Sequence, residues 1–296
     1  MNNKALTLTI VANLTSNYGE SLGNIASIQK VYKSGKTYAI RSKESLKNAI
    51  MVQSGLYDDL LVATDGVAQK EVSEEINTSN CRALEGGYMN TSGITKIRKS
   101  SFYLTDAIAF EPFINDVRFH NNLYLAQTMA KQQGINLQEK SKEAGLMPYQ
   151  YEFDKSFKKY SITIDLDRVG VDENYGQVAE IDERIFRVHQ LLESIKNLSL
   201  VVKGNLDNAE PIFVVGGIGN RKTHYFDNVV NVINDELIIT KDLKNKLAEG
   251  YSSALLEGEN FKNENEVKGE LNSESIGNFF DKLKAQVKTY YENAEN

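Results

Sequence analysis

The stretch from Gly23 to Gln53 contains a turn and a helix start that together restrict how the chain can fold. Its Ser-Gly-Lys run at residues 34–36 is typical of the tip of a β-hairpin. Ser42 is a good N-cap residue, and Glu44 in the first turn suits the positive end of the helix dipole. On a helical wheel one stripe is formed by Leu46, Ala49, Ile50 and Gln53. This stretch therefore predicts a hairpin followed by a short helix that packs one side on a core.

Positive charge is concentrated in the same stretch, although the formal net charge of the chain is -6. Between residues 30 and 47 the acid is Glu44, and the basic side chains are Lys30, Lys33, Lys36, Arg41, Lys43 and Lys47. Free backbone N–H groups and the Ser42 hydroxyl at the helix start, next to these cations, predict an anion site. Several such positive charges in a row indicate that the ligand of this site is a polyanion. The simpler interpretation is a solvated hairpin tip before an ordinary capped helix, and charge alone does not decide between the two.

Composition limits the other classes of protein. With 296 residues, of which 41% are hydrophobic, the chain can form one large domain or two smaller ones. It lacks an apolar run of about 18 residues and its first residues alternate, so we expect no signal peptide and no membrane partner. The single cysteine, Cys81, fits a reducing cytoplasm and excludes a disulfide framework. The histidines His120, His189 and His224 lack metal-binding spacing, and we expect no metal and no cofactor.

The rest of the chain alternates between strand and helix patterns. Residues 5–14 and 161–169 have the two-residue period of half-buried strands, and residues 181–195 have the period of a helix with one apolar face. Further elements are expected as a hairpin at 60–68, a core strand at 97–110, a central strand at 211–218, a flexible connection at 258–273 and a last helix at 276–290. This order predicts an α+β fold of the RRM-like or ferredoxin-like βαββαβ type, which many functions share.

Three blocks of the sequence resemble a known family. They are ANLTSNYGESLGNI at residues 12–25, IQKV at 28–31 and IRSKESLK at 40–47. In order and spacing they resemble the DevR-type backbone subunit of type I CRISPR Cascade complexes, of a type I-B-like kind, in the RAMP superfamily. The resemblance implies an RRM-like palm with inserted fingers and thumb. The palm would comprise residues 1–55, 96–111 and 158–296 with a C-terminal helix, the fingers residues 56–95 and the thumb residues 112–157.

The resemblance also implies a function, that of a subunit of an antiviral defence complex that is not an enzyme. In the family many copies assemble head to tail along a guide RNA as a helical filament. The thumb kinks the RNA and turns out one base at intervals, which leaves the others free to pair with target DNA. The implied partners are guide RNA, target DNA through the guide, further copies of the chain and other Cascade subunits, all in the cytoplasm.

Residue roles follow from the family's arginine-serine and helix motif. The resemblance implies phosphate binding by Arg41, Ser42, Lys43, Ser45 and Lys47, with Asn24 and Lys30 added from neighbouring blocks. The basic residues Lys33, Arg98 and Lys99 complete the expected RNA-binding set. A thumb wedge would come from Phe119, Leu146 and Met147, unless these residues only stabilise the arm. Where the family has an apolar or aromatic residue before a glycine, this chain has Glu85.

Two other functions remain open. Related backbone subunits of type III complexes cut RNA with an aspartate after the first helix, and this chain has Asp58 and Asp59 in about that place. Two adjacent carboxylates can hold Mg²⁺, so a metal-dependent RNase is one alternative. A stand-alone RRM-like regulator is the other, and it predicts sequence-preferring RNA binding as a monomer. A backbone subunit should instead coat RNA in many copies with little base preference.

Overall fold

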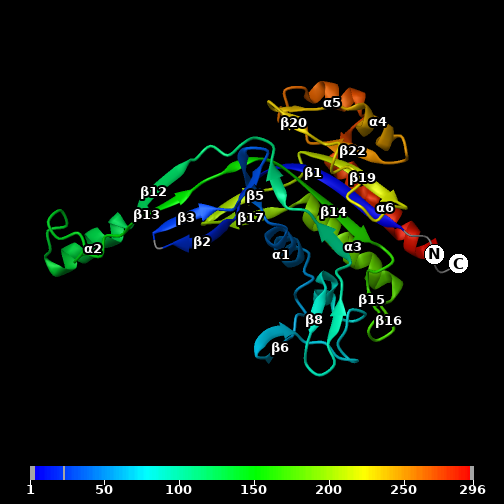
Figure 1. Cartoon of the computed structure of the whole chain (residues 1–296), viewed down its shortest axis with the longest axis horizontal. Coiled ribbons are helices and arrows are strands. Elements are labelled where there is room, and N and C mark those ends of the chain that lie inside the picture. Colours follow the sequence, from blue (N-terminus) through cyan, green and yellow to red (C-terminus); the bar gives the residue numbers. More distant parts are fainter. Residues whose placement is uncertain (1–3, 23, 294–296) are drawn as a thin grey trace.

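A computed structural model describes residues 4–22 and 24–293. Within these residues the chain forms six α-helices and several β-sheets, which confirms the predicted α+β class. Figure 1 shows a central sheet from which two arms extend in different directions. Among the described residues, we find no helix with the length and apolar character that crossing a membrane requires.

The central sheet is built around β1 (Ala5–Thr15). This strand pairs antiparallel with β14 (Lys155–Asp165) on one side and with β19 (Phe213–Gly219) on the other. The order across the sheet is β23, β22, β19, β1, β14, β11, β5 and β4, and β10 also pairs with β14. The other bounds are β4 (Lys30–Lys33), β5 (Lys36–Arg41), β10 (Phe102–Leu104), β11 (Ala107–Ala109), β22 (Ser252–Leu255) and β23 (Glu274–Ser275).

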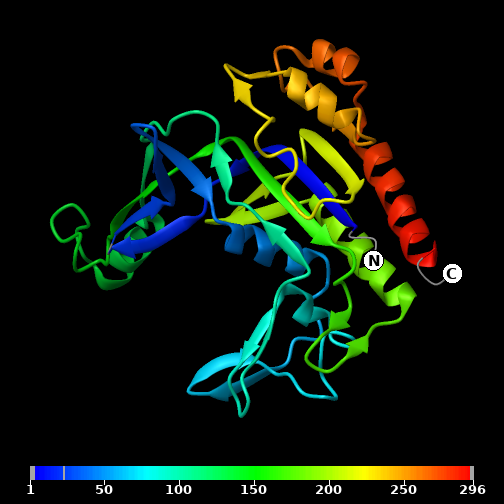
Figure 2. The same ribbon diagram turned by 45° about the vertical axis from the view of Figure 1, so that its right-hand side comes forward.

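Three helices cover one face of this sheet, as Figure 2 shows in a turned view. They are α1 (Lys43–Gln53), α3 (Ile181–Lys196) and α6 (Ile276–Asn293). Alternate residues of β1, such as Leu6 and Leu8, pack in the main core with Ile50 of α1, Leu192 of α3 and Phe280 of α6. The predicted helices at 181–195 and 276–290 are therefore confirmed, and their apolar faces meet the same side of the sheet.

The opposite face of the sheet is covered as well, so β1 is buried on both sides and the predicted half-buried strand is wrong. Val11 packs there in a second core with residues of α4 (Lys241–Leu247) and α5 (Glu264–Glu270). The polar side of the strand is also enclosed: Thr9 Oγ1 lies 2.8 Å from Ser161 Oγ, and Thr7 Oγ1 lies 3.2 Å from Thr163 Oγ1. Because these hydroxyls form hydrogen bonds with one another, the polar side chains are buried without leaving donors or acceptors unpaired.

Two predicted segments differ from the structure. Residues 258–273, expected as a flexible connection, contain α5, because Val267 packs in the second core. Residues 97–110, expected as one strand, form β9 (Lys96–Arg98), β10 and β11. Leu104 pairs with Ile162, and Ile108 pairs with Lys159. Residues 105–107 therefore lie opposite only residues 160 and 161 of β14, so a β-bulge interrupts the strand. Asp106 lies in this bulge.

The first arm, residues 56–95, carries two small hairpins. Its elements are β6 (Val62–Asp65), β7 (Val67–Lys70), the 3₁₀ helix η1 (Arg82–Gly86) and β8 (Tyr88–Asn90). The predicted hairpin at 60–68 is confirmed as β6 and β7, and Gly66 in its turn has a φ of 75°. In the second hairpin β8 pairs with β9.

The second arm, residues 112–157, extends to the far left in Figure 1. It contains β12 (Val117–Asn121), α2 (Leu123–Gln133) and β13 (Pro148–Glu152). These strands continue into a four-stranded sheet of order β12, β13, β3 and β2, with β2 at Tyr18–Leu22 and β3 at Ile25–Ile28. Short hairpins elsewhere are formed by β15 (Val171–Asp172) with β16 (Gln177–Val178), β17 (Ser199–Val202) with β18 (Asn205–Asn208), and β20 (Val232–Ile233) with β21 (Glu236–Leu237).

Candidate nucleic-acid interface

The tip of the hairpin formed by β4 and β5 presents two cations. Ser34 and Gly35 have φ values of 51° and 78°, the left-handed pair that a tight two-residue hairpin turn requires. This turn places Lys33 directly opposite Lys36 in the register. Both lysines are exposed, and neither forms a salt bridge with any residue that the structure describes. The predicted hairpin is thus confirmed, with two free positive charges at its end.

The start of α1 is less open than the sequence predicts. Ser42 caps the helix by accepting a hydrogen bond from the Ser45 amide at 3.3 Å, as predicted. However, the Ser42 amide donates to Asn17 Oδ1 at 2.8 Å, and the Lys43 amide donates to Asp106 Oδ1 at 2.8 Å. The expectation that these backbone N–H groups are free is therefore wrong, because the β-bulge places the Asp106 carboxylate where an anion would bind. The Lys43 side chain remains 57% exposed, 3.7 Å from Glu44.

A hollow of about 490 Å³ adjoins the hairpin and the start of α1. Its lining includes Tyr38, the basic residues Lys33, Lys36 and Lys159, and the acidic residues Asp106, Glu111 and Asp227. Burial lowers the pKa of Lys159, whose Nζ donates to the backbone oxygen of Asp227. The cations of this hollow that have no internal partner among the described residues are thus the two hairpin lysines.

Arg41 lies inside the protein. Its side chain is 6% exposed, and Nη1 donates to the backbone oxygen of Thr15 at 3.3 Å. Burial lowers the pKa of Arg41 to about 10, although the nearby Asp207 acts in the opposite direction. The guanidinium therefore faces the protein interior and not the hollow.

Lys47 also points inward, toward the first arm. Its Nζ donates to the backbone oxygen of Gly86 at 2.7 Å and to Ser100 Oγ at 3.0 Å, and it lies 5.0 Å from the centre of the Phe102 ring. Burial, with a smaller effect from the positive charge of Lys70, lowers the pKa of Lys47 to about 8. The structure thus uses this lysine to join α1 to the arm.

The other expected RNA-binding residues fall into two groups. Arg98 is buried, with Nη2 2.9 Å from Ser101 Oγ and 3.5 Å from Glu85 Oε2. Lys30 Nζ lies 2.6 Å from the Glu152 carboxylate. Asn24 and Lys99 are exposed, and the backbone oxygen of Asn24 accepts a hydrogen bond from the second arm, from the Gln150 amide at 2.8 Å.

Of the adjacent acids Asp58 and Asp59, the second has a local structural use. Asp59 Oδ2 accepts a hydrogen bond from the Arg82 amide at 2.6 Å, and Oδ1 accepts one from the Ala83 amide at 3.1 Å. A carboxylate at this position satisfies the first N–H groups of η1. No group of three potential metal ligands occurs among residues 4–22 and 24–293, so the pair lacks a third side chain for a metal there.

The predicted thumb wedge residues lie on the second arm. Phe119 in β12 is 62% exposed and Met147 is 55% exposed, whereas Leu146 is half-buried. The same strands carry aromatic residues on their other face that were not among the predicted site residues. These are His120, Tyr149 and Tyr151, and the pattern Tyr-Gln-Tyr at 149–151 was the available signal, since alternate residues share one face of a strand.

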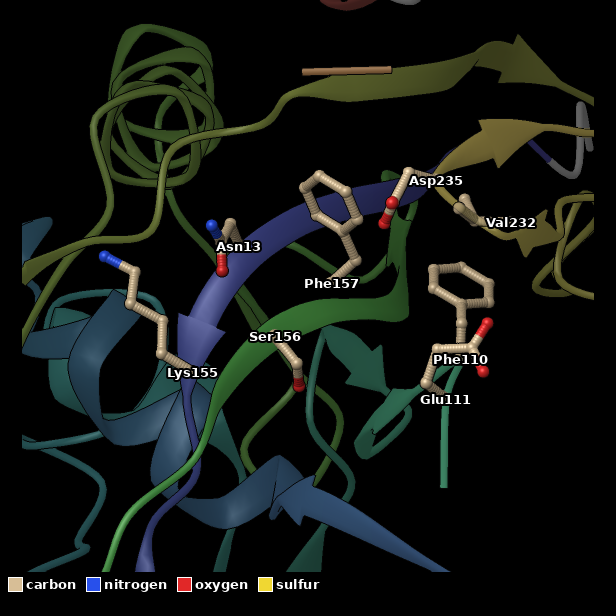
Figure 3. A pocket seen from close by; sticks show the side chains of 8 residues that line it. All are labelled: Asn13, Phe110, Glu111, Lys155, Ser156, Phe157, Val232 and Asp235. Carbon is tan, nitrogen blue, oxygen red and sulfur yellow. The ribbon is translucent and has the colours of Figure 1, made fainter. Parts of the chain in front are cut away.

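A second, smaller hollow of about 250 Å³ lies between β14 and the hairpin of β20 and β21 (Figure 3). Phe157 and Asn13 project toward it, and Glu111 and Asp235 add negative charge. Lys155 is the basic residue in this lining, and its Nζ pairs with Asp207 Oδ1 at 2.8 Å. This hollow therefore offers no free cation to a phosphate.

Comparison with known proteins relates this arrangement to a family. The model of the family described as "CRISPR-associated negative auto-regulator DevR/Csa2" matches residues 6–235. The chain is similar to a structure titled "CRISPR RNA-guided surveillance complex", with a TM-score of 0.56, 15% identity and coverage of 96% of this chain and 99% of that chain. It is also similar to one titled "CRISPR RNA-guided surveillance complex, pre-nicking", with a TM-score of 0.54, 11% identity and coverage of 86% and 93%. At such identities the likeness to these two structures concerns the fold alone.

Among curated proteins no significant relative is found. The family assignment therefore depends on the match over residues 6–235, which covers most of the chain. On that match, this chain belongs to the DevR/Csa2 family of CRISPR-associated proteins.

Proposed function

We propose that this chain is a non-catalytic backbone subunit of a type I Cascade surveillance complex in the cytoplasm. Several copies assemble head to tail along a guide RNA, hold it by its phosphates and leave its spacer bases free to pair with target DNA. The observation that carries the proposal is the pair of free cations Lys33 and Lys36, together with the exposed Lys43. They lie beside the hollow at the start of α1, in a chain whose net charge is negative.

The character of these cations favours sequence-independent binding. Lysine ammonium groups on flexible stems meet phosphate oxygens as point charges and do not read base edges. A protein that contacts successive phosphates in this way binds any sequence, with an affinity that falls as salt rises. The titles of the similar structures describe RNA-guided complexes, which supports RNA as the polyanion and other complex subunits as partners.

The proposal assigns parts of the fold to the roles that the family implies. The central sheet with α1, α3 and α6 acts as the palm, and its strand order β19, β1, β14, β11 suits an RRM-like βαββαβ unit. The 56–95 arm acts as the fingers and the 112–157 arm as the thumb. Arg41, Lys47 and Arg98 position the surface from inside, while Ser42, Ser45, Asn24, Lys30 and Lys99 border it.

The test is charge reversal at these three exposed lysines. We expect Lys33→Glu, Lys36→Glu and Lys43→Glu together to weaken binding of a single-stranded RNA about 100-fold near 0.1 M salt, independent of sequence, and to reduce the slope of log affinity against log salt by about 2. The matched control reverses Lys241, Lys262 and Lys288, which are exposed elsewhere on the chain. Fluorescence anisotropy with a labelled RNA measures the affinity and its salt dependence for both triple variants. Equal effects of the two triple variants would contradict the proposed surface.

A further inference from the structure

Three aromatic rings form an ordered cluster on the 112–157 arm. The ring of His120 in β12 lies 5.4 Å from that of Tyr149 and 4.7 Å from that of Tyr151, both in β13, with interplanar angles of 17° and 10°. The rings are nearly parallel because Arg118 pairs with Tyr151 and His120 with Tyr149 in the register, so all point to one face of the strands. Parallel, offset rings at these distances are the favourable arrangement for aromatic stacking.

The cluster is closed at one end and open at the other. Tyr18 of β2 packs edge-on against Tyr151, with centroids 6.1 Å apart, and Tyr151 is only 8% exposed. Tyr149, by contrast, is 43% exposed. His120 Nε2 is buried without a hydrogen-bond partner among the described residues, so this ring is held by stacking and not by a polar contact of that nitrogen. The parallel cluster therefore ends in an aromatic ring that is open to a further planar group.

The position of the cluster links it to the proposed RNA surface. Strand β13 pairs with β3 next to Asn24, and Lys30 at the start of β4 pairs with Glu152 at the end of β13. From Lys30 the chain runs directly into the hairpin that carries Lys33 and Lys36. A single strand held by the hairpin lysines can thus follow a continuous run of β-structure to Tyr149.

We propose that Tyr149 is a stacking platform for one nucleobase of the bound single strand, with His120 and Tyr151 fixing the orientation of its ring. This inference rests on the proposed function. Every base has a π-face, so stacking on tyrosine adds affinity without sequence preference, as a subunit that accepts any guide requires. It places the base on the face opposite Phe119, because Phe119 and His120 are successive residues of one strand.

Tryptophan fluorescence tests the inference, because the chain has no tryptophan. In Tyr149→Trp the single indole should be strongly quenched when oligoadenylate binds, but not when an abasic ribose-phosphate strand of equal length binds. The control is Phe119→Trp, whose indole lies on the other face of the same strand and should change little. Quenching at position 119 but not at 149 would overturn the inference, since the base would then lie on the opposite face.

Affinity measured by anisotropy gives a second readout. Tyr149→Leu should bind oligoadenylate about tenfold more weakly and the abasic strand unchanged, whereas Tyr149→Phe, which keeps the ring, should bind both normally. If Tyr149→Leu binds both strands as the parent does, the platform is absent although RNA binding persists. Failure of the unaltered protein to bind either strand would instead overturn the proposed function itself.

Discussion

The two arms of the molecule are attached to the central sheet in different ways. The 56–95 arm is joined through buried charges: Glu85 lies 2.9 Å from Arg187 Nη1 of α3 and 3.5 Å from Arg98 Nη2, and all three side chains are almost fully buried. The 112–157 arm is joined by pairing of β13 with β3 of the four-stranded sheet, by the partly exposed pair of Lys30 and Glu152, and by Asp154, which pairs with the buried Lys158 of β14. One arm is therefore anchored by a carboxylate shared between two buried arginines, and the other by strand pairing and by single ion pairs at its base.

The difference extends to what each arm buries. In the first arm Ala83, Leu84 and Tyr88 form a small core with Cys81. In the second, α2 buries little more than Ala126 and Ala130, while Tyr124 and Leu125 are 80% and 65% exposed. A helix with so little buried apolar surface gains little stability from packing. The first arm thus has a small core of its own, whereas the second leaves apolar side chains exposed, which fits the proposed thumb.

The largest effect that separates the arms is expected from Glu85→Gln. This change leaves Arg98 and Arg187 buried without their shared carboxylate, and it should lower the free energy of unfolding by about 3–5 kcal/mol. The control Glu143→Gln removes an exposed pair with Lys140 on the second arm and should cost less than about 0.5 kcal/mol. Urea denaturation measures both, and similar costs would remove the distinction between the arms.

A smaller, pH-dependent effect is expected from Lys47, which joins α1 to the first arm. Because burial lowers its pKa to about 8 in the folded state, the unfolded chain binds more protons between about pH 8 and pH 10. The contribution of Lys47 to the free energy of unfolding should therefore rise with pH in that window, by about 1–2 kcal/mol once partial solvent access is allowed for. Below pH 8 no such rise is expected.

Denaturation as a function of pH checks this, with Lys47→Met as the reference. The rise in the free energy of unfolding between pH 8 and pH 10 should be smaller in this variant by the contribution of Lys47, because other lysines whose pKa burial lowers, such as Lys159, also contribute to it. The exposed control Lys288→Met should keep the rise of the parent protein. If the free energy of unfolding of the parent protein, Lys47→Met and Lys288→Met changed with pH in the same way, the ammonium of Lys47 would not be desolvated in the folded state.

The smallest effect is expected at the attachment of the second arm. Glu152→Gln removes the negative charge that pairs with Lys30 at 2.6 Å. It keeps a side-chain oxygen that can accept the hydrogen bond from the Ile28 amide, as Glu152 Oε2 does at 3.0 Å. We expect a loss of about 1 kcal/mol or less in the free energy of unfolding, because the pair is partly solvated. A loss as large as that of Glu85→Gln would show that both arms are anchored equally.

Local patterns in the sequence were sufficient for most elements of the fold. The turn at Gly35, the cap at Ser42 and the apolar stripes of α3 and α6 depend on neighbouring residues, and the structure confirms them. The burial of both faces of β1 and the helix α5 were missed, because they depend on packing between residues far apart in the chain.

The direction of basic side chains could not be read from the sequence. Arg41 and Arg98 look like surface cations in a basic run, but each is buried by elements that meet only in the folded chain. A sequence signal did exist for the buried network: Glu85 stands where the resemblance implies an apolar or aromatic residue, and Arg187 lies four residues before Leu191 on the buried side of α3. An acid and a base at positions that suit apolar residues indicate a paired, buried charge.

The carboxylate of Asp106 at the start of α1 has a consequence for the subunit before any RNA is bound. The amides of Ser42, Lys43 and Ser45 are already satisfied by Asn17, Asp106 and the Ser42 hydroxyl. An anion that approached this helix end would thus have to displace the Asp106 carboxylate to reach the Lys43 amide. At this end of α1 the side chains, and not the amides of Ser42, Lys43 and Ser45, are therefore what the proposed RNA would meet.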